Sequence, residues 1–322
     1  MMARLAAAAF ALLLSFCACA QSGKVYRIGM LDVTPEADNL ANLKAFRQGM
    51  REAGYVEGQD FVLDYRSADG QRNRLAPLAA ELARAKPDVI LTRSTAAALA
   101  AMKSRSIPVV MTSSSDPVAY GVVRSLSHPG GNVTGLSTAI GEVAGKRLQL
   151  LKELAPQAKR VAAPLNLANP TAAVERRQIE TAGKSLGLQV IILDVRERAD
   201  LSRAFNAVLE QRADALLINA EAVMLANKHA IIEFAAKHGL PAIYSSREYV
   251  DAGGLLAYGV DYPHLYYRAA SYVDKILKGA RPGDLPIEKP TKLKLIINVR
   301  SATALGIGIP SQLVLRADEL VQ

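Results

Sequence analysis

Short apolar runs alternate with longer amphipathic segments along the first third of the chain. Leu40, Leu43, Phe46 and Met50 recur at helical spacing, and this pattern predicts a helix that ends at Gly54. Further helices are predicted at residues 75–85 and 96–102, with strands at residues 24–31, 61–65, 89–91 and 107–110. Strands of this length that alternate with helices favour a parallel, doubly wound sheet.

A second β-α series follows Gly135. Its pattern predicts helices at residues 143–154, 174–186, 201–211 and 228–238, and strands at residues 160–165, 189–193, 215–218 and 242–244. No Gly-, Ser- or Pro-rich linker separates the two series. We therefore expect two similar lobes, joined by strand-like crossovers near residues 133–137 and 255–260. A helix at residues 262–278 would return the chain to the first lobe.

The predicted fold is α/β, with two Rossmann-like (flavodoxin-like) lobes whose parallel sheets are joined by hinge crossovers. We assign residues 24–134 and 260–290 to lobe I, and residues 135–259 and 291–322 to lobe II. A chain of 322 residues is long enough for two cores of ordinary size. Two lobes on a hinge are typical of a binding protein whose cleft closes on a ligand.

Residues 1–20 differ in composition from the rest of the chain. An apolar run over residues 5–16 is followed by Ala18-Cys19-Ala20, which matches a cleavage site. We predict a signal peptide and export, since no later stretch approaches the roughly 18 uninterrupted apolar residues of a membrane-spanning helix. Both cysteines lie in this segment, so cleavage would leave a mature chain without thiol chemistry. Acylation of Cys17 or Cys19, which would make a lipoprotein, stays an open alternative.

The formal net charge of the chain is +9, but lysines and arginines are scattered among acidic residues. This distribution is typical of the solvated surface of a basic exported protein, and we expect no nucleic-acid partner. The four histidines lack metal-ligand spacing, and the sequence has no G-x-G-x-x-G, G-x-x-x-x-G-K-[ST] or G-x-S-x-G motif. We therefore expect neither a metal nor another cofactor.

Small polar residues follow two strands of the first series, and the longest such segment covers residues 111–137. Ligands usually bind at the carboxyl ends of strands in open α/β sheets, where backbone N–H groups and short side chains are exposed. Helix capping is the alternative role for Ser94 or Thr95, and for Asp116, which precedes Pro117. The candidate ligand-binding residues of this series are Ser94, Thr95, Ser113, Ser114, Ser115 and Asp116.

Polar residues also follow the strands of the second series. The carboxylate of Glu221 would suit an amino group, with helix capping as its alternative role. The guanidinium of Arg247 would suit a ligand carboxylate, although a surface pair with Glu248 or Asp251 is the alternative. The remaining candidate ligand-binding residues are Asn166, Asn219, Ser245 and Asp261.

Several segments of the chain resemble one known family, the ABC-transporter substrate-binding proteins, whose better understood members bind aromatic amino acids such as tryptophan or phenylalanine. These segments are D-P-V…G-V-V-x-S-L-x-x-P-G-G-N-V-T-G (116–135), Y-G-V-D-Y-P (258–263), and residues 274–288 and 304–319. The resemblance spans the mature chain. It implies a periplasmic binding protein type 1 fold, a small-molecule ligand, an ABC permease in the inner membrane as partner, and a monomer.

The chain departs from this family near the expected pocket. It has Ser94-Thr95-Ala96 where family members often have a Gly-Thr-Pro step, and Ala163-Pro164-Leu165-Asn166 where they often have a V-L-x-N-P run. These departures leave the ligand open. An aromatic ring could stack on Tyr120 or Tyr244, and an aliphatic solute could lie between the serines.

The sequence therefore predicts a periplasmic substrate-binding component of an ABC importer. It would capture a small solute, such as an amino acid, in the cleft between its lobes and deliver it to the permease without catalysis. Two alternatives stay open. A ligand-sensing subunit of a membrane signalling system would use the same binding chemistry, and an exported enzyme would use the same scaffold, because fold alone does not determine function.

Overall fold

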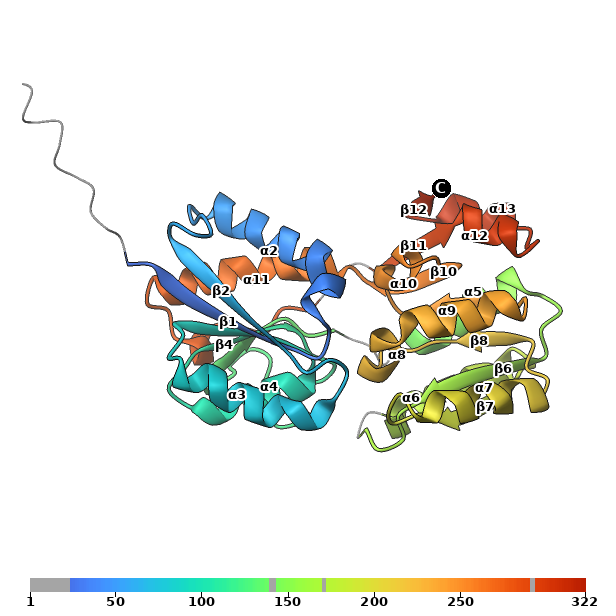
Figure 1. The fold of residues 1–322 in the computed structure, drawn as a ribbon, viewed down its shortest axis with the longest axis horizontal. Helices are drawn as coiled ribbons and strands as arrows, with labels where there is room; N and C mark the ends of the chain where they lie inside the picture. The colour runs from blue at the N-terminus through green and yellow to red at the C-terminus, as the bar shows by residue number, and fades with distance from the viewer. Residues whose placement is uncertain (1–23, 139–142, 170–171, 290–292) are drawn as a thin grey trace, which may run out of the picture.

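The chain forms two α/β lobes that lie side by side along the long axis of the molecule (Figure 1). This computed structural model describes residues 24–138, 143–169, 172–289 and 293–322. The predicted signal peptide at residues 1–20 lies outside the described residues, and so do both cysteines. The predicted lobe boundaries stay a prediction; in the structure the first sheet ends at Gly135 and the second begins at Arg160.

The first sheet has five parallel strands in the order β2-β1-β3-β4-β5. The strands are β1 (Tyr26–Asp32), β2 (Phe61–Ser67), β3 (Val89–Arg93), β4 (Val109–Ser113) and β5 (Val133–Gly135). Its α-helices are α2 (Leu40–Glu52), α3 (Leu75–Arg84), α4 (Thr95–Ala101) and α11 (Tyr262–Leu277). Short 3-10 helices are η1 (Glu36–Asn39), η2 (Arg72–Arg74), η3 (Met102–Ser104) and η5 (Pro282–Asp284). Apolar residues of α2 and α11 cover one face of the sheet, and those of α3 and α4 cover the other.

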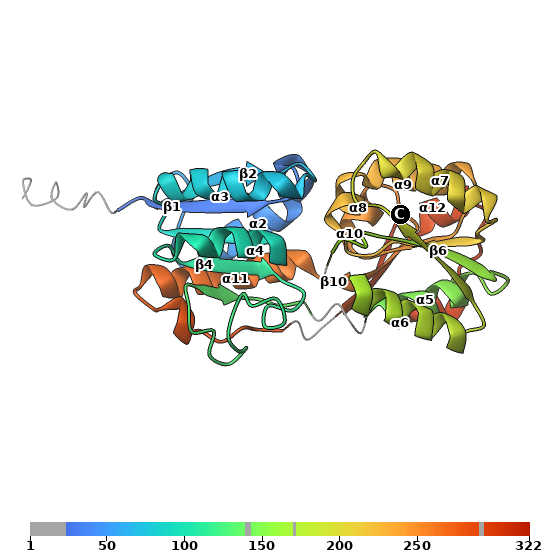
Figure 2. The same ribbon diagram turned by 90° about the horizontal axis from the view of Figure 1, so that it is seen from below.

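Helix α11 packs in the first lobe although it follows a strand of the second sheet (Figures 1 and 2). It runs against α2 at Gly49, where an added Cβ would lie 2.7 Å from both the Ala270 Cβ and the Tyr267 carbonyl oxygen. A side chain at this position would therefore force the two helices apart. The close contact anchors the returning helix to the first sheet.

The second sheet has seven strands in the order β12-β11-β10-β9-β8-β6-β7. The strands are β6 (Arg160–Leu165), β7 (Gln189–Asp194), β8 (Ala215–Leu217), β9 (Ala242–Tyr244), β10 (Leu256–Val260), β11 (Leu293–Asn298) and β12 (Glu319–Val321). The longer helices are α5 (Val143–Leu154), α6 (Ala172–Ser185), α7 (Asp200–Glu210) and α9 (Lys228–Lys237). The shorter ones are α8 (Ala222–Ala226), α10 (Arg247–Asp251), α12 (Val299–Ala304) and α13 (Ser311–Arg316).

The predicted α/β fold with two Rossmann-like lobes is confirmed, but the second sheet is not wholly parallel. Strand β11 pairs antiparallel with β10, from Leu256 opposite Ile297 to Val260 opposite Leu293. The reason lies in the chain path. Strand β10 leaves the second lobe toward α11, and β11 brings the chain back in the opposite direction, so the two neighbours must run antiparallel.

The structure shifts three predicted elements. The strand predicted at residues 107–110 lies at Val109–Ser113, so Ser113 belongs to the strand. The segment after Asp116 forms a turn in place of the helix expected at Pro117. The crossover predicted at residues 255–260 is β10, an inner strand of the second sheet.

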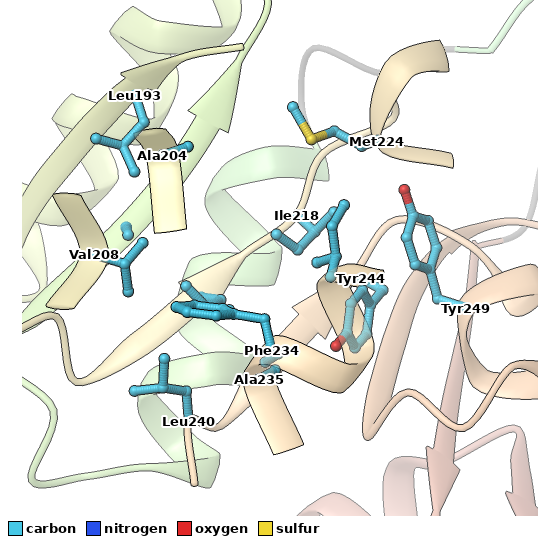
Figure 3. Packing of buried hydrophobic residues seen from close by; sticks show 14 of the residues in the cluster. Leu193, Ala204, Val208, Ile218, Met224, Phe234, Ala235, Leu240, Tyr244 and Tyr249 are labelled. Carbon is cyan, nitrogen blue, oxygen red and sulfur yellow. The ribbon is translucent and has the colours of Figure 1, made fainter. Parts of the chain in front are cut away.

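Two apolar clusters flank the second sheet, and Figure 3 shows part of one of them. Phe234 extends toward Val208, and Tyr244 lies beside Tyr249 with their ring centroids 4.8 Å apart. Tyr244 is 1% exposed in this cluster. The expectation that an aromatic ligand could stack on Tyr244 is therefore wrong, because another protein ring already occupies its face.

Candidate ligand-binding site between the lobes

A cavity of about 530 Å³ lies between the lobes, where strands of both sheets end. Segments after β3, β4 and β5 line it from the first lobe. The segments after β8 and β9, together with α6, line it from the second lobe. The predicted site residues among its lining are Ser94, Thr95, Ser113, Ser114, Ser115, Asp116, Glu221 and Ser245. Their contact with a ligand stays a prediction.

Hydroxyl groups form the first-lobe edge of the cavity. The Thr95 Oγ1 lies 3.0 Å from the Ser114 Oγ and 3.2 Å from the Ser115 Oγ, and it accepts a hydrogen bond from the Ser115 backbone N–H at 3.2 Å. These contacts link the start of α4 to the end of β4. The Asp116 Oδ1 accepts from the Ala119 N–H at 3.0 Å, so its side chain stabilises the turn that follows. Beside the Asp116 carboxylate, this edge therefore presents short neutral hydroxyl groups that can donate or accept hydrogen bonds.

Ser94 both caps a helix and lines the cavity. Its Oγ accepts a hydrogen bond from the Ala97 N–H at 3.3 Å, which is the capping role expected as the alternative. Its backbone has φ 89° and ψ 152°, a region that glycine populates and other residues rarely do. The Ser94 N–H donates to the Ser113 carbonyl at 3.1 Å, which holds this unusual turn against β4.

Two carboxylates form the second-lobe edge. Glu221 is 5% exposed and Glu175, in the first turn of α6, is 8% exposed. Asn169 Nδ2 donates to the Glu221 Oε1 at 3.1 Å and lies 3.3 Å from Oε2. Glu221 precedes α8, but its side chain makes no capping hydrogen bond there. The capping alternative therefore does not account for this carboxylate.

Burial controls the ionisation of both acids. Burial, and after it the charge of Glu175, raises the pKa of Glu221 to about 7, while Asn169 and Arg72 oppose the rise. Burial also raises the pKa of Glu175, and the charge of Arg147 opposes it. The second-lobe edge therefore retains a proton at a higher pH than ordinary carboxylates do.

Arg147 lies beneath this edge and is 2% exposed. Its Nε donates to the Tyr258 carbonyl at 2.7 Å, and its Nη1 donates to the Asn219 Oδ1 at 3.3 Å. The predicted site residue Asn219 thus holds this guanidinium and is not among the residues that line the cavity. Burial lowers the pKa of Arg147, although the charge of Glu175 opposes the shift.

Three other predicted site residues also lie away from the cavity lining. The Asn166 Oδ1 accepts from the Ala168 N–H at 3.1 Å in the turn after β6. Arg247 forms partly exposed ion pairs with Asp251 and Glu319. Asp261 caps α11 through the His264 N–H and pairs with Lys294 at 2.6 Å. Arg247 and Asp261 line a second recess of about 490 Å³, beside α2 and β10.

An ion pair between the lobes was not predicted from the sequence. The Arg93 Nη2, at the end of β3, lies 2.5 Å from the Glu248 Oε1 on α10. The Arg93 guanidinium also lies 4.6 Å from the centroid of the Tyr262 ring, and Tyr262 lines the cavity. Burial alone would raise the pKa of Glu248, but the charge of Arg93 holds it below the usual value. A charged residue two positions after the apolar run of β3 is the sequence signal that could have predicted this pair.

A second ion pair joins the lobes at the rim. The Lys228 Nζ, on α9, lies 2.7 Å from the Asp38 Oδ1, on η1. The Asn42 Nδ2, on α2, lies 3.3 Å from the Glu248 Oε1. Polar contacts from both lobes therefore hold the cavity in its present shape.

Within the described parts of the chain, no group of three or more His, Cys, Asp or Glu side chains is arranged to hold a metal ion. None of the helices described by the structure is both long and apolar enough to cross a membrane.

Two α/β lobes with a cavity between their strand ends are the arrangement typical of two-lobed solute-binding proteins. The model of the ABC transporter substrate-binding protein family matches residues 33–321, and the chain belongs to this family. The tyrosine-binding protein of Clostridioides difficile (strain R20291) is 27% identical over 265 residues, which are 82% of this chain and 76% of that protein. The resemblance seen in the sequence is thereby confirmed.

Solved structures share the fold. A conserved domain protein from Vibrio cholerae O1 biovar El Tor gives a TM-score of 0.83 at 26% identity, over 92% of this chain and 100% of that chain. An ABC domain from Streptococcus pneumonia in complex with L-Trp gives a TM-score of 0.82 at 24% identity, over the same shares. The expected fold of periplasmic binding proteins is confirmed.

Proposed function

We propose that this chain is the substrate-binding component of an ABC importer, and that it captures an amino acid between its lobes and delivers it to a permease. The observation that carries the proposal is the cavity lined from both lobes by residues at strand ends. Its volume of about 530 Å³ suits a small solute. One relative is named a tyrosine-binding protein, and a protein of the same fold holds L-Trp. Both support an amino acid, and an aromatic one in particular, as the solute.

The ligand would meet different chemistry on the two sides of this cavity. We place its hydrogen-bonding contacts with the first lobe on Ser94, Thr95 and Ser115, whose hydroxyl groups line the cavity. On the second lobe, Glu221 and Ser245 are the predicted contacts that line it. When the lobes close around the solute, both sets of contacts would form together in the bound state.

The proposal contains no catalytic step. None of the described residues that line the cavity is a histidine or a cysteine, so its serines have no neighbouring imidazole to activate them. We infer export to the periplasm from the predicted signal peptide, and we propose that the chain acts as a monomer beside its membrane partner.

Thermal unfolding of the chain from Gln21 to Gln322 against the twenty amino acids, sugars, purines and dicarboxylates tests the binding function. A ligand at a hundred times its dissociation constant should add about 2.7 kcal/mol of stability, which is a clear rise in midpoint. We expect an aromatic amino acid to give the largest rise. A sugar or purine that raises the midpoint while every amino acid fails would contradict the proposed solute class.

Transport is tested separately from binding. Deletion of the gene from its host should abolish uptake of the identified amino acid at micromolar concentration, and the exported chain should restore it. If uptake is unchanged while a response to the same amino acid is lost, the partner is a signalling system and not a permease.

A further inference from the structure

The two carboxylates at the second-lobe edge come from separate elements and face the same cavity. Glu175 projects from the first turn of α6, and Glu221 lies between β8 and α8. Both are more than nine-tenths buried. Two adjacent buried carboxyl groups destabilise a fold when both are ionised, unless a cation or hydrogen-bond donor compensates their charge. Their position at a cavity wall therefore calls for a partner.

The described residues provide hydrogen-bond donors to only some of the oxygens of these two carboxylates. Asn169 donates to Glu221. Among the described residues, however, the Glu175 Oε1 has no hydrogen-bond partner. The side chain of Gln178, three residues further along α6, also lines the cavity, and its Oε1 likewise lacks a donor in the described structure. Unpaired acceptors of this kind are costly when buried, and they indicate where a donor belongs.

The nearby cations of the protein do not supply that donor. Arg147 lies beneath the edge and donates to the Tyr258 carbonyl and the Asn219 Oδ1. Arg72, on η2 of the first lobe, lines the cavity and its charge acts on Glu221, and Lys289 also lines the cavity. Within the described residues, no ion pair within 4.0 Å joins any cation to Glu175 or Glu221.

We propose that Glu175 and Glu221 form a subsite for the ammonium group of the ligand. A primary ammonium has three N–H donors and no acceptor, which matches carboxylate oxygens presented by two residues. For an amino acid, the bound group is the α-amino group, and the carboxylate then points toward the neutral hydroxyl edge of the first lobe. This assignment rests on the proposed function and narrows it, because sugars and dicarboxylates offer no ammonium and would leave the two acids uncompensated.

Three ligand series test the subsite on the chain from Gln21 to Gln322. L-tyrosine and L-tryptophan are compared by calorimetry with their des-amino analogues, 3-(4-hydroxyphenyl)propionate and indole-3-propionate, and with tyramine and tryptamine. We expect each amino acid to bind at least tenfold more tightly than its des-amino analogue. A charge-assisted hydrogen bond of about 1.5–3 kcal/mol corresponds to a ratio of about ten to a hundred and fifty.

The isosteric variants Glu175→Gln and Glu221→Gln should each reduce that ratio to near one. Glu233→Gln is the matched control, because Glu233 is exposed on α9 of the same lobe and does not line the cavity. The ratio should be unchanged in this control. Circular dichroism of each variant identifies any that fail to fold, and for such a variant the wild-type ratio alone decides.

The outcomes separate this inference from the function on which it rests. Des-amino acids that bind as tightly as amino acids would overturn the ammonium subsite while leaving a receptor for aromatic solutes. Amines that bind as tightly as the amino acids, with losses in both glutamine variants, would keep the subsite and refute an amino-acid cargo. A wild-type chain that binds none of the ammonium compounds would overturn both.

Discussion

The two edges of the cavity occupy equivalent positions in similar lobes, yet their chemistry is opposite. The first-lobe edge consists of hydroxyl groups that bond to one another, as Thr95 does with Ser114 and Ser115. The second-lobe edge carries two buried carboxylates, Glu175 and Glu221, and among the described residues the Glu175 Oε1 has no hydrogen-bond partner. A repeated α/β plan thus fixes where a ligand lies, while the side chains at the strand ends determine which end of the ligand each lobe receives.

The second lobe also contributes a charge beside the hydroxyl groups of the first-lobe edge. Arg93 would be a buried cation at this edge, but Glu248 reaches it from α10. The difference between the edges is therefore a property of the assembled lobes. Among the variants considered, removal of Glu248 should therefore have the largest effect on the protein.

Glu248→Leu should lower the free energy of unfolding by about 3–5 kcal/mol, because Arg93 is left as a buried charge without its partner. The double variant Arg93→Met/Glu248→Leu should recover only part of that loss, because the buried Asp32 then loses the cation whose charge acts on it. Urea unfolding followed by circular dichroism measures both. Arg247→Met is the control, since the ion pairs of Arg247 are partly exposed and worth about 1 kcal/mol or less. Equal losses in Glu248→Leu and the control would contradict a buried neutralising role.

The second-lobe edge should respond to pH, whereas the hydroxyl edge should not. The pKa of Glu221 is raised to about 7, so this acid becomes protonated as the pH falls through 7 and no longer attracts an ammonium. We expect the affinity of the wild type for L-tyrosine to fall at least about tenfold between pH 8 and pH 5.5. Calorimetry at several pH values measures this, and Glu221→Gln should be nearly flat. Equal slopes in the wild type and Glu221→Gln would assign the titration to another group.

The stability of the ligand-free chain should change with pH in the opposite direction. A carboxyl group whose pKa is raised on folding holds a proton in the folded state that it releases on unfolding, between its ordinary value of 4.5 and about 7. The contribution of this group to the stability of the folded state is fully present below pH 4.5 and is lost as the pH rises through 7. Glu221→Gln should therefore gain stability relative to the wild type above pH 7. The charges of Glu175 and Arg72 act on Glu221, and the charge of Arg147 acts on Glu175, so these groups also influence the pH at which the stability changes.

Disturbing the hydroxyl edge should have a smaller effect. Thr95→Ala removes one neutral hydroxyl from the cavity and should weaken L-tyrosine binding by about two- to tenfold, as expected for a neutral hydrogen bond. The des-amino analogue should lose affinity by the same factor, so the ratio between the two ligands stays constant. Thr303→Ala, on exposed α12, is the matched control. A changed ratio in Thr95→Ala would show that both edges contact the ammonium group.

These two edges differ in how far the sequence predicts them. The hydroxyl edge was found because its residues follow apolar strands without interruption, and strand ends in a parallel sheet meet at one edge. Glu175 was missed because it lies on an amphipathic helix, where a polar residue normally indicates a solvated face. Its burial brings it near Arg147 and Glu221, which are distant in the sequence, and no local pattern predicts such contacts.

Helix α10 shows why the contact between Glu248 and Arg93 was not predicted from the sequence. Arg247 and Glu248 are neighbours, but successive residues of a helix point about 100° apart. Glu248 therefore reaches Arg93, while Arg247 pairs with Asp251 and Glu319 beside the second recess. Because this helix of five residues was not predicted, no pattern in the sequence indicated which of the two side chains faces the other lobe.

The smallest expected effect concerns the backbone that supports the hydroxyl edge. Ser94→Gly should relieve the strain of the positive φ of 89°, which stabilises the fold. It also removes a capping oxygen and makes the unfolded chain more flexible, and both effects destabilise the fold. We therefore expect the free energy of unfolding to rise by about 1 kcal/mol or less. Ser94→Ala loses the cap without relieving the backbone and should be destabilised by about 0.5–2 kcal/mol. Thermal unfolding should therefore rank glycine above serine and serine above alanine at this position. Equal losses in both variants would mean that the capping oxygen alone matters, and that the turn between β3 and α4 stores no strain.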